Sequence, residues 1–246
     1  MPNHVCNQLS MRGIGKKKEL MQVDKNNQIS EGDLDLDKIV KMPEELDMTS
    51  GMEGFSILAY LYKIMPQVNY ELKFTEGSIV APDKSERLER YIENTGKTMD
   101  QLAEEGKKYV DNIYNHGAPS WYWWHIQNWG TKWNTYDGYI VNDDIIRFYT
   151  AWDPPIAAIL ALSKMYPYDE IDLKFISEDV SYCGEIKFLD GAIIEENMYE
   201  YMSPQSMQTC VELEDYNYAL YDDEGNYCSK AFITKAFGYI EDKEND

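Results

Sequence analysis

The six tryptophans of this chain all lie between Trp121 and Trp152, five of them within residues 121–133. Tryptophan is the largest apolar side chain, and its indole N–H needs a hydrogen-bond partner when it is buried. So dense a group of rings predicts either the centre of a core or a binding platform. The flanking segments favour a core, at the junction where an inserted helical segment meets a sheet. Replacing Trp129 or Trp133 by Ala is then expected to cost ~3–5 kcal/mol as a core truncation.

The clearest secondary-structure pattern follows over residues 144–188. Apolar and polar residues alternate over 144–151, which predicts a half-buried strand. Asp153 and Pro154 are typical of the N-cap and the first position of a helix, which is expected to end at Met165. Alternation returns over 171–175 and 182–188 and predicts two antiparallel strands. The whole segment is therefore predicted to be β-α-β-β.

The N-terminal part of the chain predicts a β-α-β unit. Alternation over residues 3–13 indicates a strand, and residues 16–24 have the spacing of a short helix closed by Asn26 and Asn27. Leu34 and Leu36 indicate a second strand that stops before Pro43. Joined to the later β-α-β-β segment, this unit predicts an α+β fold whose antiparallel sheet is ferredoxin-like, a split β-α-β arrangement.

A mainly helical insertion is expected at about residues 44–135. Apolar residues at helical spacing predict helices over 55–65, 84–93 and 98–114, and a fourth from Pro119 to about Trp129. The insertion would interrupt a ferredoxin-like domain formed by residues 1–195. Residues 196–246 form an acidic, tyrosine-rich C-terminal extension that is expected to pack on this domain.

Three sequence blocks carry a resemblance to a known family. They are Met1-Pro-Asn-His-Val-Cys-Asn7, Asn128-Trp-Gly-Thr-Lys-Trp-Asn134 and Tyr149-Thr-Ala-Trp-Asp-Pro-Pro155, the last followed by Leu162-Ser-Lys-Met-Tyr-Pro167. In this order the chain resembles, over residues 1 to about 188, phage, plasmid and prophage proteins that carry a ferredoxin-like domain named after the plasmid protein YubB. The resemblance implies a ferredoxin-like fold and an origin in a mobile element. It implies no iron–sulfur cluster and no catalytic residue.

Charge is the second informative feature of the sequence. The formal net charge is −21. Such a field repels nucleic acid and anionic membranes and favours basic partners, although it also serves solubility alone. The start of the chain lacks the pattern of a signal peptide, and no apolar run is long enough to span a bilayer. A location in the cytoplasm of a bacterial host, with reduced cysteines, is therefore expected.

Catalytic and metal-binding patterns find little support. His4, His116 and His125 are the only histidines, and His125 is expected to be a packed, hydrogen-bonded ring. Asp33, Asp35 and Asp37 would share one face of a strand and could hold a cation, but a solvated edge is the more common reason for such a pattern. Nucleic-acid binding on the sheet is disfavoured by charge, although Trp133 and Trp152 could stack on bases. No catalytic residue, cofactor or metal is predicted.

Three hypotheses of function remain. The first is a non-enzymatic counter-defence protein that mimics DNA and occupies a basic nucleic-acid-binding surface of a host protein. Its expected contact residues are the acids Glu212, Glu214, Asp215, Asp222, Asp223 and Glu224. The second is a structural or oligomerising module in which acidity serves only solubility. The third is an enzyme or a binder of small ligands, such as nucleotides, whose tryptophan-lined pocket would lie between the inserted helices and the sheet. The sequence favours the first and does not indicate the oligomeric state.

Overall fold

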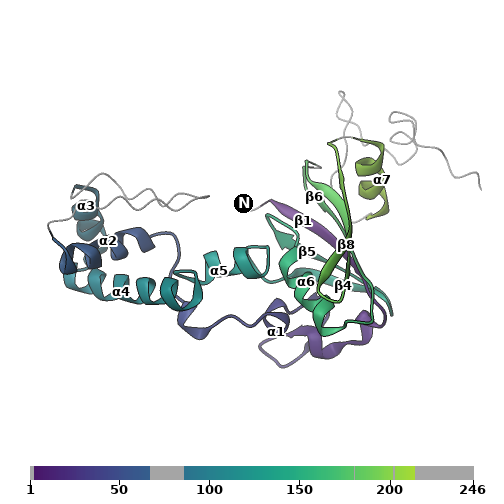
Figure 1. Ribbon diagram of the computed structural model, residues 1–246, viewed down its shortest axis with the longest axis horizontal. Coiled ribbons are helices and arrows are strands. Elements are labelled where there is room, and N and C mark those ends of the chain that lie inside the picture. Colours follow the sequence, from purple (N-terminus) through teal and green to yellow (C-terminus); the bar gives the residue numbers. More distant parts are fainter. Residues whose placement is uncertain (1–2, 67–85, 180, 202, 214–246) are drawn as a thin grey trace, which may run out of the picture. The chain divides into compact units, whose positions relative to one another are not determined.

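The computed structural model describes residues 3–66, 86–179, 181–201 and 203–213. The chain divides into two compact units, one formed by Met1–Lys41 and Gln127–Asp246 and the other by Met42–Ile126. The first is called here the sheet unit and the second the helical unit, after their main elements (Figure 1). Within the described ranges, no helix is long and apolar enough to cross a membrane.

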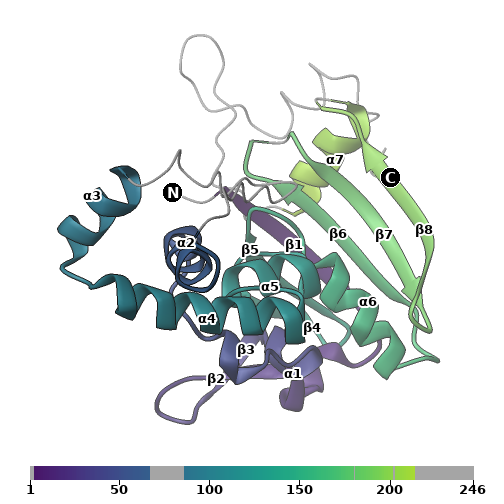
Figure 2. The ribbon, with the colours of Figure 1, turned by 60° about the vertical axis from the view of Figure 1, so that its left-hand side comes forward.

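The sheet unit contains a six-stranded antiparallel sheet. In spatial order its strands are β4 (Tyr136–Asn142), β5 (Ile145–Ala151), β1 (His4–Ser10), β6 (Ile171–Ser177), β7 (Cys183–Leu189) and β8 (Ala192–Tyr199). The central strand β1 is antiparallel to both of its neighbours, β5 and β6, so these two run parallel to each other. Helix α6 (Ile156–Met165) connects them. This is a split β-α-β unit around β1, and Figure 2 shows β6, β7 and β8 side by side beyond it.

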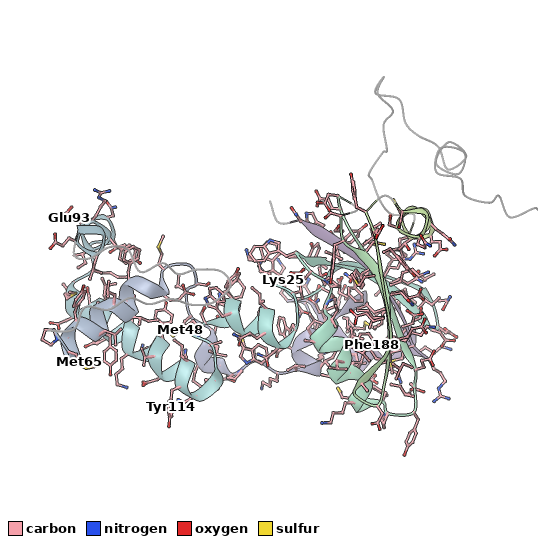
Figure 3. The ribbon with its side chains drawn as sticks, turned by 45° about the horizontal axis from the view of Figure 1, so that its top comes forward. Lys25, Met48, Met65, Glu93, Tyr114 and Phe188 are labelled. Atoms are coloured by element: carbon pink, nitrogen blue, oxygen red, sulfur yellow. The ribbon has the colours of Figure 1, made fainter. Side chains whose placement is uncertain are left out.

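Over its four inner strands, one face of this sheet is buried and forms the core of the unit. Its side chains come from the four inner strands and are each at most 1% exposed: Leu9, Ile146, Phe148, Leu173, Phe175, Ile186 and Phe188. Helix α6 adds the buried side chains of Ala158, Ile159 and Leu162. Burial of each large apolar side chain stabilises the fold by roughly 1.5–3 kcal/mol. Figure 3 labels Phe188 among the packed side chains of this unit.

The predicted β-α-β-β segment is confirmed as β5, α6, β6 and β7. Only the start of the helix differs, because α6 begins at Ile156 with Pro155 at its N-cap. Asp153 lies in the preceding turn, where its carbonyl oxygen accepts a hydrogen bond from Thr150 Oγ1 at 2.9 Å. The turn therefore uses the residue that was expected to cap the helix.

The helix expected over residues 16–24 is wrong. Two short 3-10 turns, Ile14–Lys16 and Lys18–Leu20, lead into β2 (Met21–Val23), which pairs with β3 (Ile29–Leu34) in a separate two-stranded sheet. The carboxylate of Asp24 accepts backbone hydrogen bonds from Asn26 and Gln28, both at 2.8 Å. Such a side-chain-to-backbone turn favours a hairpin over continuation of a helix. The two asparagines thus belong to a hairpin turn.

The strand expected around Leu34 and Leu36 is also wrong in its second half. β3 ends at Leu34, and α1 (Leu36–Ile39) follows. Asp35 caps this short helix by accepting a hydrogen bond from the Asp37 backbone N–H at 3.2 Å. Asp33 instead accepts from Gly138 N at 2.6 Å. Asp33 and Asp35 therefore serve backbone groups in different elements, Asp37 lies within α1, and the three aspartates do not share a strand face.

Both edge strands, β4 and β8, were absent from the prediction. β4 has irregular register against β5 and contains Asp137 in the left-handed region at φ 51°. β8 is exposed at every position except its last, so its sequence shows no alternation of apolar and polar residues. A further helix, α7 (Pro204–Glu212), starts at the N-cap Ser203. The expected extension from residue 196 thus begins inside β8 and includes α7.

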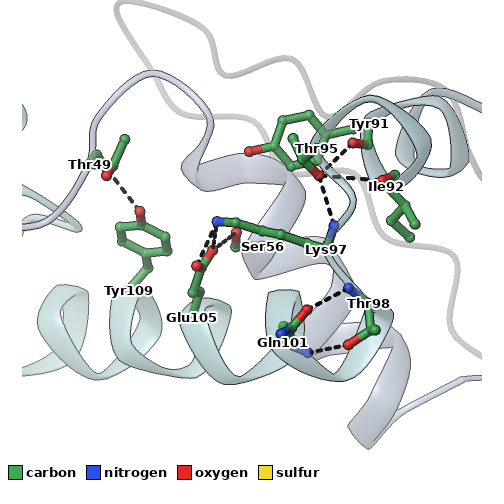
Figure 4. Close-up of polar contacts among 10 residues, drawn as sticks. All are labelled: Thr49, Ser56, Tyr91, Ile92, Thr95, Lys97, Thr98, Gln101, Glu105 and Tyr109. Carbon is green, nitrogen blue, oxygen red and sulfur yellow. Dashed lines mark hydrogen bonds and ion pairs between the residues drawn. The ribbon is translucent and has the colours of Figure 1, made fainter.

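The predicted helices of the insertion are confirmed in the helical unit. They are α2 (Glu53–Ile64), α3 (Glu86–Thr95), α4 (Met99–His116) and α5 (Trp121–Asn128), the last of which extends past the division between the units. Thr98 begins α4 with a capping box, in which Thr98 and Gln101 each accept a backbone hydrogen bond from the other (Figure 4). Tyr114 on this helix is 90% exposed and projects away from it (Figure 3).

Helices α2 and α4 approach each other closely at Gly106. A Cβ atom on Gly106 would lie 1.8 Å from the Ser56 carbonyl oxygen. Nearby, Lys97 Nζ donates to both carboxylate oxygens of Glu105 at 2.6 and 2.9 Å, and Ser56 Oγ donates to the same carboxylate at 3.2 Å (Figure 4). A glycine is therefore required sterically at position 106, and polar side chains join the two helices beside it.

Candidate functional site: the second face of the sheet and its tryptophan corner

The second face of the sheet carries rows of polar side chains. One row crosses all six strands in register and consists of Tyr139, Arg147, Gln8, Lys174, Glu185 and Asn197. The next row consists of Asn142, Ile145, Ser10, Asp172, Lys187 and Glu195. Directly opposite residues in a sheet are close enough to interact. This face therefore presents a charged, hydrogen-bonding surface where the other face presents a core.

The C-terminal end of α7 is anchored on this charged face. Arg147 donates hydrogen bonds to the carbonyl oxygens of Glu212 at 3.0 Å and Leu213 at 2.9 Å. Carbonyl groups at the end of a helix lack partners within it, and a cation there interacts favourably with the helix dipole. Lys174 Nζ binds the Glu212 carboxylate at 2.7 Å. α7 and α6 thus lie on opposite sides of the sheet (Figure 1).

Ionisation of the anchoring pair follows from these contacts. Partial burial opposes ionisation of Glu212, but hydrogen bonds from Lys174 and Gln208 outweigh it and lower the pKa of this carboxyl group. Burial likewise opposes protonation of Lys174, and its bond to Glu212 raises the pKa of the ammonium group nevertheless. Both groups are therefore charged near neutral pH, as an ion pair requires.

A pair of carboxyl groups lies beside this anchor. Burial, followed by the hydrogen bond and the charge of Glu185, raises the pKa of Asp172 to about 7. Lys174 and Lys187 oppose this shift but do not cancel it. Asp172 and Glu185 are diagonal neighbours on β6 and β7, so two negative charges there repel each other. Near neutral pH the pair consequently retains a proton for part of the time.

The six acids predicted to contact a partner can be placed only in part. Glu212 ends α7, where its carboxylate accepts hydrogen bonds from Lys174 and Gln208, both at 2.7 Å. It therefore serves an internal contact. The others, Glu214, Asp215, Asp222, Asp223 and Glu224, lie outside the described residues.

A series of hydrogen bonds through His4 and Tyr136 lies toward the other end of this face. His4 Nδ1 is 2.6 Å from the hydroxyl oxygen of Tyr136, and this hydroxyl donates to the Thr150 carbonyl oxygen at 3.1 Å. Because the hydroxyl has a single proton, His4 Nδ1 carries the proton that joins the two rings. Burial, followed by nearby acidic charges, raises the pKa of Tyr136 to about 12. These hydrogen bonds therefore connect β1, β4 and β5 through side chains.

The sequence blocks 128–134 and 149–155 meet at one corner of the sheet unit. Thr131 Oγ1 donates to the Ala151 carbonyl oxygen at 2.8 Å, and the Lys132 backbone N–H donates to the same oxygen at 3.3 Å. Trp129 is 4% exposed, and its indole N–H donates to the Val40 carbonyl oxygen at 2.8 Å. This tryptophan is a core residue with a satisfied polar group, as predicted.

Trp133 and Trp152 form the exposed part of the same corner, called here the tryptophan corner together with Lys132. Their side chains are 40% and 38% exposed. The ammonium group of Lys132 lies 4.9 Å from the ring centroid of Trp133 and 4.5 Å from that of Trp152. Both distances are within the range of cation–π attraction. The prediction that Trp133 is a core residue is therefore wrong.

The remaining tryptophans belong to α5. Trp124 is 6% exposed and His125 9% exposed. The His125 ring packs against Trp121 with ring centroids 5.3 Å apart, and against Trp124 at 6.1 Å. His125 is thus a packed histidine, as expected. The cluster that appears continuous in the sequence consists in the structure of two core rings, Trp124 and Trp129, two half-buried rings on α5 and an exposed pair.

Groups suited to nucleophilic or metal chemistry are buried or dispersed in the described ranges. Burial is the main cause that raises the pKa of the Cys183 thiol to about 12, which keeps it protonated and weakly nucleophilic. Cys6 and Cys210 are also buried free thiols. Within residues 3–66, 86–179, 181–201 and 203–213, no three His, Cys, Asp or Glu residues are placed to hold a metal ion. The arrangement is suited to binding through charge and aromatic rings.

The topology and this arrangement define a ferredoxin-like domain of the α+β class. Residues 128–222 match the family described as "Ferredoxin-like domain in Api92-like protein", which confirms the predicted fold class. Among solved structures, the crystal structure of protein api92 from Yersinia pseudotuberculosis is similar at 10% identity, covering 81% of this chain and 98% of that one, with a TM-score of 0.35. A likeness of that size carries no conclusion about function. The comparison with curated proteins finds no match.

Proposed function

We propose that this chain acts by binding, as an acidic protein that occupies a basic, nucleic-acid-binding surface of a host protein. The observation that carries the proposal is its charge: the formal net charge is −21. Residues 127–213 contribute strongly, with fifteen acidic residues against five basic ones. A field of this sign and size attracts basic surfaces and repels nucleic acid and anionic membranes.

Internal contacts of the basic side chains strengthen this argument. In the part of 127–213 that the structure describes, Arg147 binds helix-end carbonyls, Lys174 binds Glu212, and Lys187 binds Glu195 at 2.8 Å. Lys132 lies on two indole rings. Most basic side chains of the segment thus interact with groups of the protein itself, whereas many carboxylates remain exposed to solvent. An approaching molecule therefore meets mainly negative charge.

The biological setting is part of the proposal. Resemblance of three sequence blocks to the YubB-type proteins supports an origin in a phage or plasmid, and hence a site of action in the bacterial cytoplasm. For a mobile element, a protein that competes with DNA for a nuclease or a nucleic-acid sensor would counter host defence. In this proposal the chain mimics the charge of DNA, binds no nucleic acid itself and needs no cofactor.

Capture from a bacterial lysate tests the proposal. The full chain is immobilised, the lysate is treated with nuclease to remove bridging nucleic acid, and bound proteins are eluted with salt and identified. A basic nucleic-acid-binding protein is expected to be captured. Purified, this protein should bind either a DNA duplex or the immobilised chain but not both, so that added duplex releases it.

A charge-reduced variant is the matched control. Asp222→Asn, Asp223→Asn and Glu224→Gln together remove three of the predicted contact charges with little change in side-chain volume. Weaker capture by this variant is expected, because electrostatic attraction sets the encounter rate and partner choice. If no basic protein is retained even at low salt, or if the captured protein binds DNA and the chain together, the proposal is wrong.

A further inference from the structure

Trp152 combines two unfavourable features that a residue serving only as a turn would avoid. Its backbone has φ 79°, in the left-handed region that is uncommon for bulky residues and costs roughly 1–2 kcal/mol. Its indole ring is 38% exposed, although the ring is among the most apolar of side chains. Glycine or asparagine would satisfy the same turn without either cost.

The surrounding backbone fixes Trp152 in this conformation. Its N–H donates to the Asn3 carbonyl oxygen at 2.8 Å, and the carbonyl oxygen of the preceding Ala151 accepts from Thr131 and Lys132. Pro154 and Pro155 follow directly and restrict the chain further. Strain that neighbouring contacts impose so firmly is concentrated at binding sites and active sites in proteins. The indole is thus held outward on a rigid support.

Trp133 supplies a second ring, and a cation already lies on both. The Lys132 ammonium is within 5 Å of each indole centroid, at 4.9 and 4.5 Å. Paired aromatic faces attract a cation through the negative potential of their π systems, and tryptophan is the strongest of the aromatic residues in this respect. The corner therefore shows the chemistry of a cation site, with a side chain of the protein itself as its occupant.

We propose that Trp133 and Trp152 form a surface site for a cationic side chain, arginine or lysine, of the basic partner, and that Lys132 occupies this site in the free protein. The proposal rests on the proposed function for the identity of the partner. Planar arginine stacks on an indole as well as attracting it electrostatically, so arginine is the better occupant. Lys132 is displaced when the partner binds and returns when it leaves.

The test uses a small probe with an uncharged isostere. N-acetyl-arginine amide is titrated into the full chain, and the indole N–H signals of Trp133 and Trp152 are followed by NMR, with the Trp129 signal as an internal reference. Arginine amide is expected to shift the first two signals and N-acetyl-citrulline amide, which lacks the charge, to leave them in place. Trp133→Leu and Trp152→Leu should each abolish the response of the remaining ring while the Trp129 signal stays unchanged.

Lys132→Met provides the decisive variant, because it keeps the aliphatic stem and removes the competing charge. Binding of arginine amide should tighten about fivefold to tenfold if Lys132 occupies the rings for 80–90% of the time, roughly. Equal responses to arginine and citrulline, or an unchanged affinity in Lys132→Met, would overturn the proposal. Loss of arginine binding in Lys132→Met, together with binding of a single-stranded oligonucleotide by the unmodified chain, would instead indicate a base-stacking site.

Failure of this proposal can be told apart from failure of the proposed function. If lysate capture succeeds and is equally strong with Trp133→Leu and Trp152→Leu, the function stands and the tryptophan corner is not the contact. If arginine amide binds as expected and no basic protein is captured, the cation site stands and the partner has been misidentified. If capture succeeds and weakens in both variants, both proposals are supported.

Discussion

Tryptophans close together in this sequence have different roles, and burial decides which. Trp129 is 4% exposed and donates its indole N–H to Val40, whereas Trp133 is 40% exposed. Trp129→Ala is therefore expected to destabilise the protein by ~3–5 kcal/mol and Trp133→Ala by under about 1 kcal/mol. Urea unfolding of the two variants measures the difference. Equal losses would show that the exposed ring carries packing that its surface area does not reveal.

Asp172 should make stability depend on pH in an unusual direction. Burial and Glu185 raise its pKa to about 7 in the folded protein, from 3.8. Between these values the folded state holds the proton more firmly than the unfolded state, so the free energy of unfolding falls as pH rises through this window. Asp172→Asn removes the contribution of this carboxyl group to the pH dependence of the free energy of unfolding. Relative to the unmodified protein, the variant should gain stability steadily from about pH 4 to about pH 7 and keep the gain above it.

Urea unfolding over that pH range measures the effect. Glu196→Gln, which removes an exposed carboxylate on the edge strand β8, is the control and should follow the unmodified protein. Parallel curves for Asp172→Asn and the unmodified protein would mean that the Asp172–Glu185 pair is solvated well enough to ionise normally.

Helix α7 depends on the sheet for its position. Arg147 donates hydrogen bonds to two carbonyl oxygens at the C-terminal end of α7. Together with the other contacts of the Arg147 side chain, these charge-assisted bonds stabilise the folded protein by roughly 1.5–3 kcal/mol. Arg147→Ala should therefore speed amide hydrogen exchange over residues 204–213, with little change in β5 and β6. Arg147→Lys should have an intermediate effect, because a lysine keeps the charge but not the forked geometry. Lys174→Met, which breaks a partly exposed ion pair, should cost only about 0–1 kcal/mol.

Elements that depend on local interactions were predictable, and those that depend on distant partners were not. The α4 capping box and the alternation of β5, β6 and β7 are complete within short segments, so the sequence shows them directly. β2 and β3 are joined by the turn that Asp24 stabilises. Asn26 and Asn27 in this turn are equally common at the end of a helix, so the sequence alone did not distinguish the two structures. β8 lacks alternation because both of its faces are exposed. An edge strand of this kind is specified mainly by the strand it joins.

The same reasoning explains which part of the candidate site could be foreseen. The rings and the lysine of the tryptophan corner are visible in the sequence, but their exposure is not. For Trp152, exposure accompanies a left-handed backbone, and its N–H donates to the carbonyl oxygen of Asn3, which is distant in the sequence. The rows of charged side chains on the second sheet face could likewise be recognised only once the register of all six strands was known. Residue types were therefore predictable, whereas their neighbours across the sheet were not.

At the scale of the whole molecule, the excess of acid should give salt two opposite effects. With a formal net charge of −21, carboxylates repel one another in the folded state, and screening relieves this repulsion. Raising sodium chloride from about 0.01 M to about 1 M shortens the Debye length from ~30 Å to ~3 Å. The midpoint of urea unfolding should therefore rise with salt. Affinity for the proposed basic partner should fall over the same range, because salt screens that attraction as well.

The charge-reduced variant separates these two effects from general salting-out. Asp222→Asn, Asp223→Asn and Glu224→Gln should flatten both dependences, since each scales with charge. Sodium chloride is preferable to sodium sulfate, because sulfate strengthens apolar burial whatever the net charge. If stability rises with salt but affinity does not fall, the acidity supports solubility alone and the partner is recognised by other contacts. If the variant reproduces both slopes of the unmodified chain, the C-terminal acids are not the source of the field, and the carboxylates of the sheet unit are the ones to neutralise next.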